Sequence, residues 1–134
     1  MDKKEIIAFI TANPIGYLAT VDGDAARVRG MDTLQADDDG LVFYTGKNKD
    51  VYKQLAADPN VEVCYFAKGK QVRVRGRLEM LESDEIKKQV VEKRPFLKPM
   101  VARGYEMLAV CRLKGKASYW SMENMAVSPV YIDF

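Results

Sequence analysis

The stretch GYLATVDGDAARVRGMD, residues 16–32, decides the predicted fold. Residues 16–21 are rich in β-forming side chains and run directly into Asp22-Gly23-Asp24, a sequence typical of a hairpin turn. Residues 25–34 then have the pattern of the returning strand. Arg27 and Arg29 alternate with Val28 in this strand, so we expect both guanidinium groups on one face and Val28 on the other.

More strands and few helices follow along the chain. The predicted strands cover residues 41–45, 61–66, 71–81, 107–113 and 130–134. Helical periodicity occurs at residues 3–12, 50–57 and about 83–93, whereas residues 94–105 contain Pro95, Pro99 and Gly104 and are expected to be irregular or a broken helix. Gly76 inside a strand indicates a bulge or a close backbone approach. Too few helices are present for repeated βαβ units, so the sequence predicts one α+β domain over residues 1–134, an antiparallel barrel with a few flanking helices.

The composition excludes several kinds of chemistry. The chain of 134 residues contains no histidine, which removes Ser-His-Asp and Cys-His catalysis and histidine metal sites. Cys64 and Cys111 do not form a CxxC pair, and we interpret both as small core hydrophobes in a reducing compartment. The formal net charge of +2 is much smaller than that of a typical nucleic-acid-binding domain. No apolar run is long enough to cross a bilayer and no secretory signal is recognisable, so we expect no membrane partner and a cytoplasmic protein.

Residues 45–50, TGKNKD, form a candidate anion-binding loop between a predicted strand and a predicted helix. A glycine turn that leads into a helix N-terminus presents free backbone N–H groups to an anion. Lys47 and Lys49 add positive charge, while Thr45 and Asn48 add hydrogen-bonding groups. The alternative interpretation is structural, with Asp50 acting only as the cap of the helix.

A second basic segment lies in the predicted strand at residues 71–81, where Arg73, Arg75 and Arg77 alternate with small apolar residues. Three like charges on one strand face need an anion, acidic neighbours across the sheet, or open solvent. The single tryptophan, Trp120, is typical of a core or an interface, and it is also suited to forming the wall of a planar ligand site. No carboxylate pair is suited to acid–base catalysis.

Taken in order, these segments resemble the FMN-binding split-barrel proteins related to pyridoxamine 5'-phosphate oxidase. The resemblance is carried by GYLATVDGDAARVRGMD, by GLVFYTGKNKDVYKQLAADPNVEVCYF and by QVRVRGRLEML, and it covers roughly Ile6 to Phe134. It implies a six-stranded antiparallel Greek-key split barrel. It also implies a homodimer with one FMN in each of two clefts along the subunit interface.

The same resemblance implies a set of cofactor contacts. Arg29 matches the arginine that ends the P-x-x-R segment of the family, although Ala26 replaces the proline. The Ser-Arg-Lys run that holds the phosphate in the family is reduced here to Lys49-Asp50-Val51. Gln71 and Arg73, and with them Trp120, are expected to approach the flavin ring from the partner subunit. The full expected set is Arg27, Val28, Arg29, Gly30, Tyr44, Thr45, Asn48, Lys49, Gln71, Arg73 and Trp120.

The function that the resemblance implies is an FMN-dependent oxidoreductase acting on a small-molecule substrate or a nicotinamide reductant. The tail SMENMAVSPVYIDF lacks arginine and the chain lacks histidine, which argues against a vitamin B6 phosphate as the substrate. One alternative is a flavin-binding electron carrier or storage protein without efficient turnover. Others keep the barrel but bind deazaflavin or haem. A nucleic-acid-binding barrel based on the Arg73-Arg75-Arg77 strand is a further alternative, and the low net charge argues against it.

Overall fold

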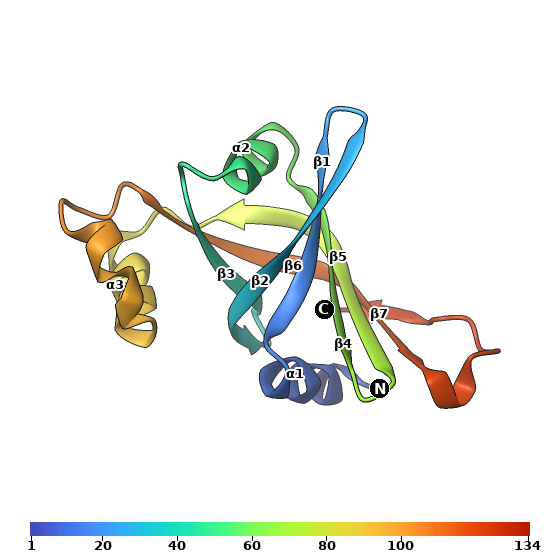
Figure 1. Cartoon of the computed structure of the whole chain (residues 1–134). Helices are drawn as coiled ribbons and strands as arrows, with labels where there is room; N and C mark the ends of the chain where they lie inside the picture. The colour runs from blue at the N-terminus through green and yellow to red at the C-terminus, as the bar shows by residue number, and fades with distance from the viewer.

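The computed structural model describes all of residues 1–134, and most of them build a β-barrel (Figure 1). The helices are α1 (Lys3–Ala12), α2 (Asp50–Ala57) and α3 (Asp84–Lys93), with short 3-10 helices η1 (Pro95–Val101) and η2 (Met122–Asn124). The strands are β1 (Ile15–Asp22), β2 (Ala25–Asp37), β3 (Gly40–Gly46), β4 (Asn60–Ala67), β5 (Lys70–Met80), β6 (Leu108–Ser121) and β7 (Tyr131–Asp133).

The barrel closes because β6 pairs with β3. The strands follow the order β3-β2-β1-β4-β5-β6, every pairing is antiparallel, and the β3–β6 pairing joins the two ends of the sheet. Strand β1 lies between β2 and β4, which is a Greek-key arrangement. The short β7 pairs with β6 alone and stands outside the ring of six. The expected six-stranded antiparallel α+β barrel is therefore confirmed.

Strand β6 is longer than the sequence predicted. The predicted strand ended at Leu113 and left Trp120 in a tail, whereas the observed strand continues to Ser121. Lys114-Gly115-Lys116 has the composition of a turn, but Gly115 lies directly opposite Gly76 of β5 and the pairing runs through it. As a result Trp120 is held in the sheet, opposite Gln71.

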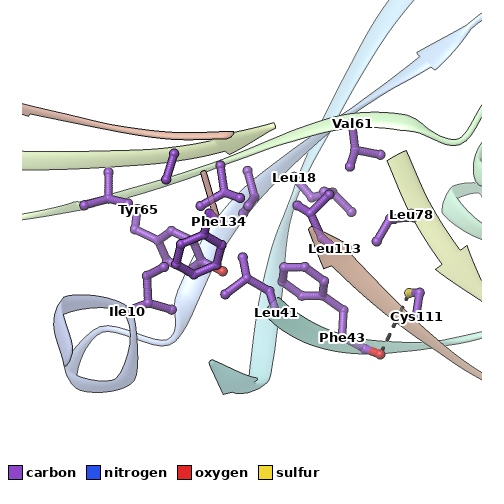
Figure 2. Packing of buried hydrophobic residues seen from close by; sticks show 14 of the residues in the cluster. Ile10, Leu18, Leu41, Phe43, Val61, Tyr65, Leu78, Cys111, Leu113 and Phe134 are labelled. Atoms are coloured by element: carbon purple, nitrogen blue, oxygen red, sulfur yellow. Dashed lines mark hydrogen bonds between the residues drawn. The ribbon is translucent and has the colours of Figure 1, made fainter. Parts of the chain in front are cut away.

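The barrel interior holds the main hydrophobic core, part of which is drawn in Figure 2. Ile6 and Ile10 of α1 are buried in it at one end of the barrel, and α2 lies at the other end (Figure 1). Tyr65 is fully buried, and its hydroxyl group is hydrogen-bonded to the Thr33 hydroxyl group at 2.6 Å. That bond satisfies both buried polar groups, which would otherwise destabilise the core.

The two cysteines have different environments. Cys111 is buried, its thiol points to the carbonyl oxygen of Phe43 (Figure 2), and burial raises the pKa of this thiol to about 12. Cys64 lies on the outward face of β4 and is only half-buried. The interpretation as a core residue is confirmed for Cys111 and wrong for Cys64, because alternation along β4 gives the inward positions to Val63 and Tyr65.

A second, smaller cluster lies outside the barrel, where α3 and η1 pack on β3 and β6. Its buried members are Val42, Leu81, Val90, Val91, Leu97, Leu108 and Val110. Residues 95–101, expected to be irregular or a broken helix, form η1. This cluster covers the outer surface of β3 and β6 and leaves the outer surfaces of β1, β2 and β4 uncovered.

Gly76 and Gly115 allow β5 and β6 to approach closely. They are direct cross-strand partners, and a Cβ atom on either one would overlap a backbone carbonyl oxygen of the facing strand. For Gly76 this oxygen belongs to Lys114, and for Gly115 it belongs to Arg75. The close approach that the sequence indicated at Gly76 is therefore confirmed.

We expect Gly115→Ala to lower the free energy of unfolding by about 1–3 kcal/mol, because the backbone of β5 must move to admit the methyl group. Urea denaturation followed by circular dichroism measures this. Gly30→Ala is the matched control, since nothing lies within 4 Å of an added Cβ there and the strand stays intact. Equal effects of the two substitutions would contradict the close approach.

Candidate functional site

Arg29 is held in place by neutral groups. Its side chain lies on the face of the sheet that Leu18 occupies, and its Nη1 donates to the Leu18 carbonyl oxygen at 3.1 Å and to the Thr20 hydroxyl oxygen at 2.8 Å. Its Nη2 donates to Oε1 of Gln54 at 2.6 Å, and the Thr20 hydroxyl donates to the same oxygen at 2.6 Å. These four residues link β1 and β2 to α2.

The charge of Arg29 has no carboxylate partner within the chain. Partial burial lowers the pKa of this guanidinium, but arginine remains protonated in proteins. Arg27, two residues earlier on the same face, instead pairs with Asp22 at 3.1 Å in an exposed position. Arg29 therefore presents a fixed positive charge, whereas the charge of Arg27 is already compensated.

The TGKNKD loop leads into α2 as the sequence predicted. Lys49 is the N-cap residue, and no side chain accepts a hydrogen bond at this cap. The alternative in which Asp50 caps the helix is wrong, because Asp50 is the first residue of the helix itself. An uncapped N-terminus leaves backbone N–H groups for an anion. Gln54, which accepts a hydrogen bond from Arg29, lies about 7.5 Å from Lys49 along the axis of the same helix.

The loop side chains differ in their exposure and contacts. Asn48 and Lys49 are exposed, and Thr45 is half-buried at the end of β3. The Nζ of Lys47 instead lies 3.5 Å from the Glu82 carboxylate and 5.7 Å from the centre of the Tyr52 ring. Lys49 is thus the loop lysine without an ion-pair partner.

Tyr44 is already occupied by contacts within the chain. Its hydroxyl group donates to the Asp32 carboxylate, and burial raises the pKa of Tyr44 to about 12. Arg94 donates from Nε to the same carboxylate at 2.8 Å, and these hydrogen bonds lower the pKa of Asp32. The three side chains tie η1 and the end of α3 to β2 and β3.

Gln71, Arg73 and Trp120 come together on the outer surface of β5 and β6. With residues 125–129 they line a groove of about 380 Å³. Arg73 donates from Nη2 to the Tyr131 hydroxyl at 2.8 Å, and its Nη1 lies 3.9 Å from the Glu62 carboxylate. Its Nε is buried and has no hydrogen-bond partner. The sequence-predicted alternation is confirmed here, with Val72 and Val74 buried on the other face.

An exposed apolar patch joins this groove to β2. Its members, here called the apolar face, are Ile15, Tyr17, Val21, Val28 and Phe66. Cross-strand pairing places Tyr17 beside Gly30 and Cys64, and it places Phe66 beside Gln71. Val28 is 68% exposed. The predicted contact residues Val28 and Gly30 therefore lie on the same surface of the sheet as Gln71 and Arg73.

Within one chain the predicted residues form two separate groups. Arg29 faces α2 at one side of the sheet, and Gln71, Arg73 and Trp120 stand on the other side. No hydrogen bond or ion pair connects the groups. The expectation that the second group acts from a partner subunit remains a prediction.

Sequence reasoning did not identify several residues of these groups. Thr20 and Gln54 hold Arg29, and period-2 alternation from Leu18 along β1 is a signal that could have identified Thr20. Tyr131 holds Arg73 from 58 positions away, a contact for which the sequence contains no signal. No group of three or more acidic, cysteine or histidine side chains forms a metal site. None of the helices has the length and apolar character that crossing a bilayer requires.

Comparisons with known proteins agree with one another. The sequence profile described as pyridoxamine 5'-phosphate oxidase matches residues 2–117. A pyridoxine/pyridoxamine 5'-phosphate oxidase of Mycolicibacterium gilvum is 35% identical over 71 residues, which cover 51% of this chain and 33% of that relative. The match thus spans about a third of the relative's length.

Solved structures share the fold. A NimC/NimA family protein of Clostridium acetobutylicum superposes with a TM-score of 0.81 at 25% identity, covering 98% of this chain and 93% of the other. A protein of Listeria innocua described as a putative pyridoxamine 5'-phosphate oxidase superposes with a TM-score of 0.68 at 21% identity. The superposition covers 81% of this chain and 89% of the other. The second likeness bears on the fold alone.

We expect Asp32→Asn to lower the free energy of unfolding at pH 7 by about 1–3 kcal/mol, because Arg94 loses its ionic partner. The folded state holds the pKa of Asp32 below its usual range, so this stabilisation is present above about pH 4 and is lost as the pH falls through the folded-state pKa. Urea denaturation at pH 7 and at pH 3 should show a difference from the wild type that narrows at pH 3.

Asp22→Asn is the control, because the carboxylate of Asp22 pairs with Arg27 in an exposed position. Its effect should stay within about 0.5 kcal/mol. An Asp32→Asn effect of the same size at both pH values would show that lost packing, and not lost charge, is responsible.

Proposed function

This chain belongs to the pyridoxamine 5'-phosphate oxidase family, and on that premise we propose that it binds FMN and acts as an FMN-dependent oxidoreductase on a small molecule. The observation that supports this best is Arg29, a positioned guanidinium with no carboxylate partner. A buried or half-buried arginine is expected to pair with an anion, and the chain itself supplies none here.

The phosphate end of FMN fits the residues around α2. A phosphate dianion gains from the uncapped N–H groups at the start of α2 and from the charges of Lys49 and Arg29. Asn48 and Thr45 add hydrogen-bonding groups at the same loop. The Asp50 carboxylate in the first helical turn repels a phosphate and offsets the charge of the neighbouring Lys49. Arg29 is therefore the more important of the two charged contacts.

The ring end of FMN fits the outer surface of the sheet. An isoalloxazine ring is planar and largely apolar, and Val28 and Gly30 offer an exposed side chain and an open backbone on that surface. Gln71 and Arg73 carry the polar groups suited to the ring edge, and Trp120 offers an aromatic surface. In this proposal these three side chains come from the partner subunit.

A second copy of this chain is the partner that we propose for the apolar face. Tyr17 is 54% exposed and Phe66 is 52% exposed, in the middle of a sheet surface that no helix covers. A contiguous apolar patch of this kind marks an association surface. A homodimer built on it also brings the Arg73 group of one subunit toward the Arg29 group of the other, which one chain cannot do.

FMN, once bound, supplies the redox chemistry by accepting and returning a hydride or electrons. The side chains of this protein would then bind the phosphate, orient the ring and exclude water, and none of these tasks requires histidine. We include a nicotinamide reductant as the electron donor. We do not extend the proposal to vitamin B6 phosphates, because residues 121–134 contain neither arginine nor histidine to hold the phosphate of such a substrate.

We expect the purified protein to retain about one FMN per subunit after desalting, measured by visible absorption. Arg29→Ala combined with Lys49→Ala should weaken FMN binding by about 10- to 100-fold or more, because two charged hydrogen-bonding groups are lost. Lys53→Ala, on an exposed position of the same helix, is the control and should retain FMN fully.

Full FMN retention by the double variant would contradict the phosphate site at α2. If the wild-type protein does not bind FMN but retains a deazaflavin, the cofactor is a deazaflavin and the proposed cleft still holds it. A protein that holds FMN tightly but is reduced only slowly by nicotinamide dinucleotides would be an electron carrier or a flavin store.

We expect Tyr17→Glu to convert the dimer into a monomer, because a carboxylate on the apolar face cannot be buried without a partner. Sedimentation should give twice 15.2 kDa for the wild type and 15.2 kDa for the variant. Phe96→Glu is the control, as Phe96 is an exposed aromatic residue on η1, outside the apolar face. A monomeric wild type would refute the shared cleft.

A further inference from the structure

A small pocket lies between α3 and the outer surface of β2, β3 and β6. Its volume is about 100 Å³, well below the roughly 300–1,000 Å³ of sites for drug-sized ligands, so it suits a compact ion. Its polar lining consists of Gln35 of β2, Gln89 and Lys93 of α3, and Arg112 of β6. None of the residues that line it belongs to the set proposed to hold FMN.

The pocket lining carries two positive charges and no acidic side chain. The Lys93 ammonium group donates to Oε1 of Gln35 at 2.8 Å, which is a neutral acceptor. Neither Lys93 nor Arg112 takes part in an ion pair of the chain. Two cations that share one small pocket repel each other, and an anion between them removes that repulsion.

The terminal nitrogens of Arg112 are accessible to a ligand. Its Nε is enclosed by the protein, and we assign it no role. Nη1 and Nη2 are not among the enclosed atoms, and neither forms a hydrogen bond within the chain. The two terminal N–H groups of a guanidinium match two oxygens of a phosphate, and this pairing is stronger than a bond between neutral groups.

The carboxylates nearest to the pocket in the sheet leave both charges uncompensated. Glu79 is the cross-strand partner of Arg112, but it is exposed and forms no ion pair with it. Asp37 accepts from the amide nitrogen of Gln35, which leaves the amide oxygen of Gln35 to Lys93. The pocket therefore keeps a net positive charge beside an apolar lining that includes Val42 and Val90.

We propose that this pocket binds a compact tetrahedral oxyanion of the phosphate class. In this arrangement the ion lies between Lys93 and Arg112, and the side-chain amide of Gln89 donates to it. A dianion balances the two cations, and the apolar lining strengthens the attraction by excluding water. The bound ion would link α3 to β6. This site is separate from the proposed flavin site and does not depend on it.

The test is a titration with inorganic phosphate at neutral pH and constant ionic strength, followed by heteronuclear NMR of the protein saturated with FMN. We expect saturable shifts of the backbone amide signals of Gln35, Gln89 and Arg112. Chloride at the same ionic strength should not produce them, because it lacks the oxygens that pair with a guanidinium. Glycerol phosphate in a parallel titration distinguishes the two sources of the group. Shifts with both compounds indicate the phosphate group of an ester, and shifts with inorganic phosphate alone indicate the free ion.

Four substitutions test the two cations. Arg112→Gln should weaken phosphate binding at least about tenfold, and Arg112→Lys should weaken it less because the charge remains. Lys93→Gln should weaken binding by a smaller factor, about threefold or more, because Lys93 is exposed to solvent. Lys88→Gln is the matched control, since Lys88 is an exposed lysine of α3 that does not line the pocket, and it should leave binding unchanged.

The same titration of the Arg29→Ala and Lys49→Ala double variant separates this pocket from the anion site at α2. Phosphate shifts at Gln35, Gln89 and Arg112 should persist there, also if the wild-type protein binds no FMN. Shifts that disappear in the double variant would overturn the proposal. Equal shifts with chloride, or full phosphate binding by folded Arg112→Gln and Lys93→Gln variants, would overturn it as well.

Discussion

The double pairing of β6 is the constraint on which the rest of the structure depends. Its residues 111–113 are hydrogen-bonded to β3 on one side and to β5 on the other, and this joins the two ends of the sheet into a barrel. The glycine pair at Gly76 and Gly115 lets the strand continue past the closure point to Trp120. Barrel closure and the groove at Trp120 are thus consequences of one strand, and inward alternation around the closed ring places the core in its interior.

The arginines of this protein differ in what balances their charge. Arg94 is paired with Asp32 inside a hydrogen-bonded cluster, and Arg27 is paired with Asp22 in solvent. Arg29 is instead held by neutral oxygens, and Arg73 keeps a buried donor without an acceptor. The first two arginines stabilise the chain by themselves. Arg29 is oriented by the fold and has no carboxylate partner, a property that suits an anion site, whereas Arg73 lies 3.9 Å from the Glu62 carboxylate.

Much of the fold could be predicted because it depends on local pattern. Alternating apolar residues, the turn at Gly23 and the close approach at Gly76 were all readable in order along the chain, and the alternation of Arg73, Arg75 and Arg77 is confirmed. The prediction failed where a local signal was overruled by tertiary contacts. Gly115 has the appearance of a turn but is held in β6, and Cys64 has a core-like composition but lies on an outward position of β4.

The sequence by itself therefore determined the order of the strands, the alternation along β5, the loop into α2 and the resemblance to one family, because these follow from residue types at short spacing. Only the tertiary structure decided which charges remain unpaired. Gln54 reaches Arg29 across 25 positions because α2 packs on β1, and Tyr131 reaches Arg73 across 58 because β7 pairs with β6 next to β5. The physical reason is that a hydrogen bond depends on distance in space, and no local pattern encodes the distance between residues so far apart in the chain.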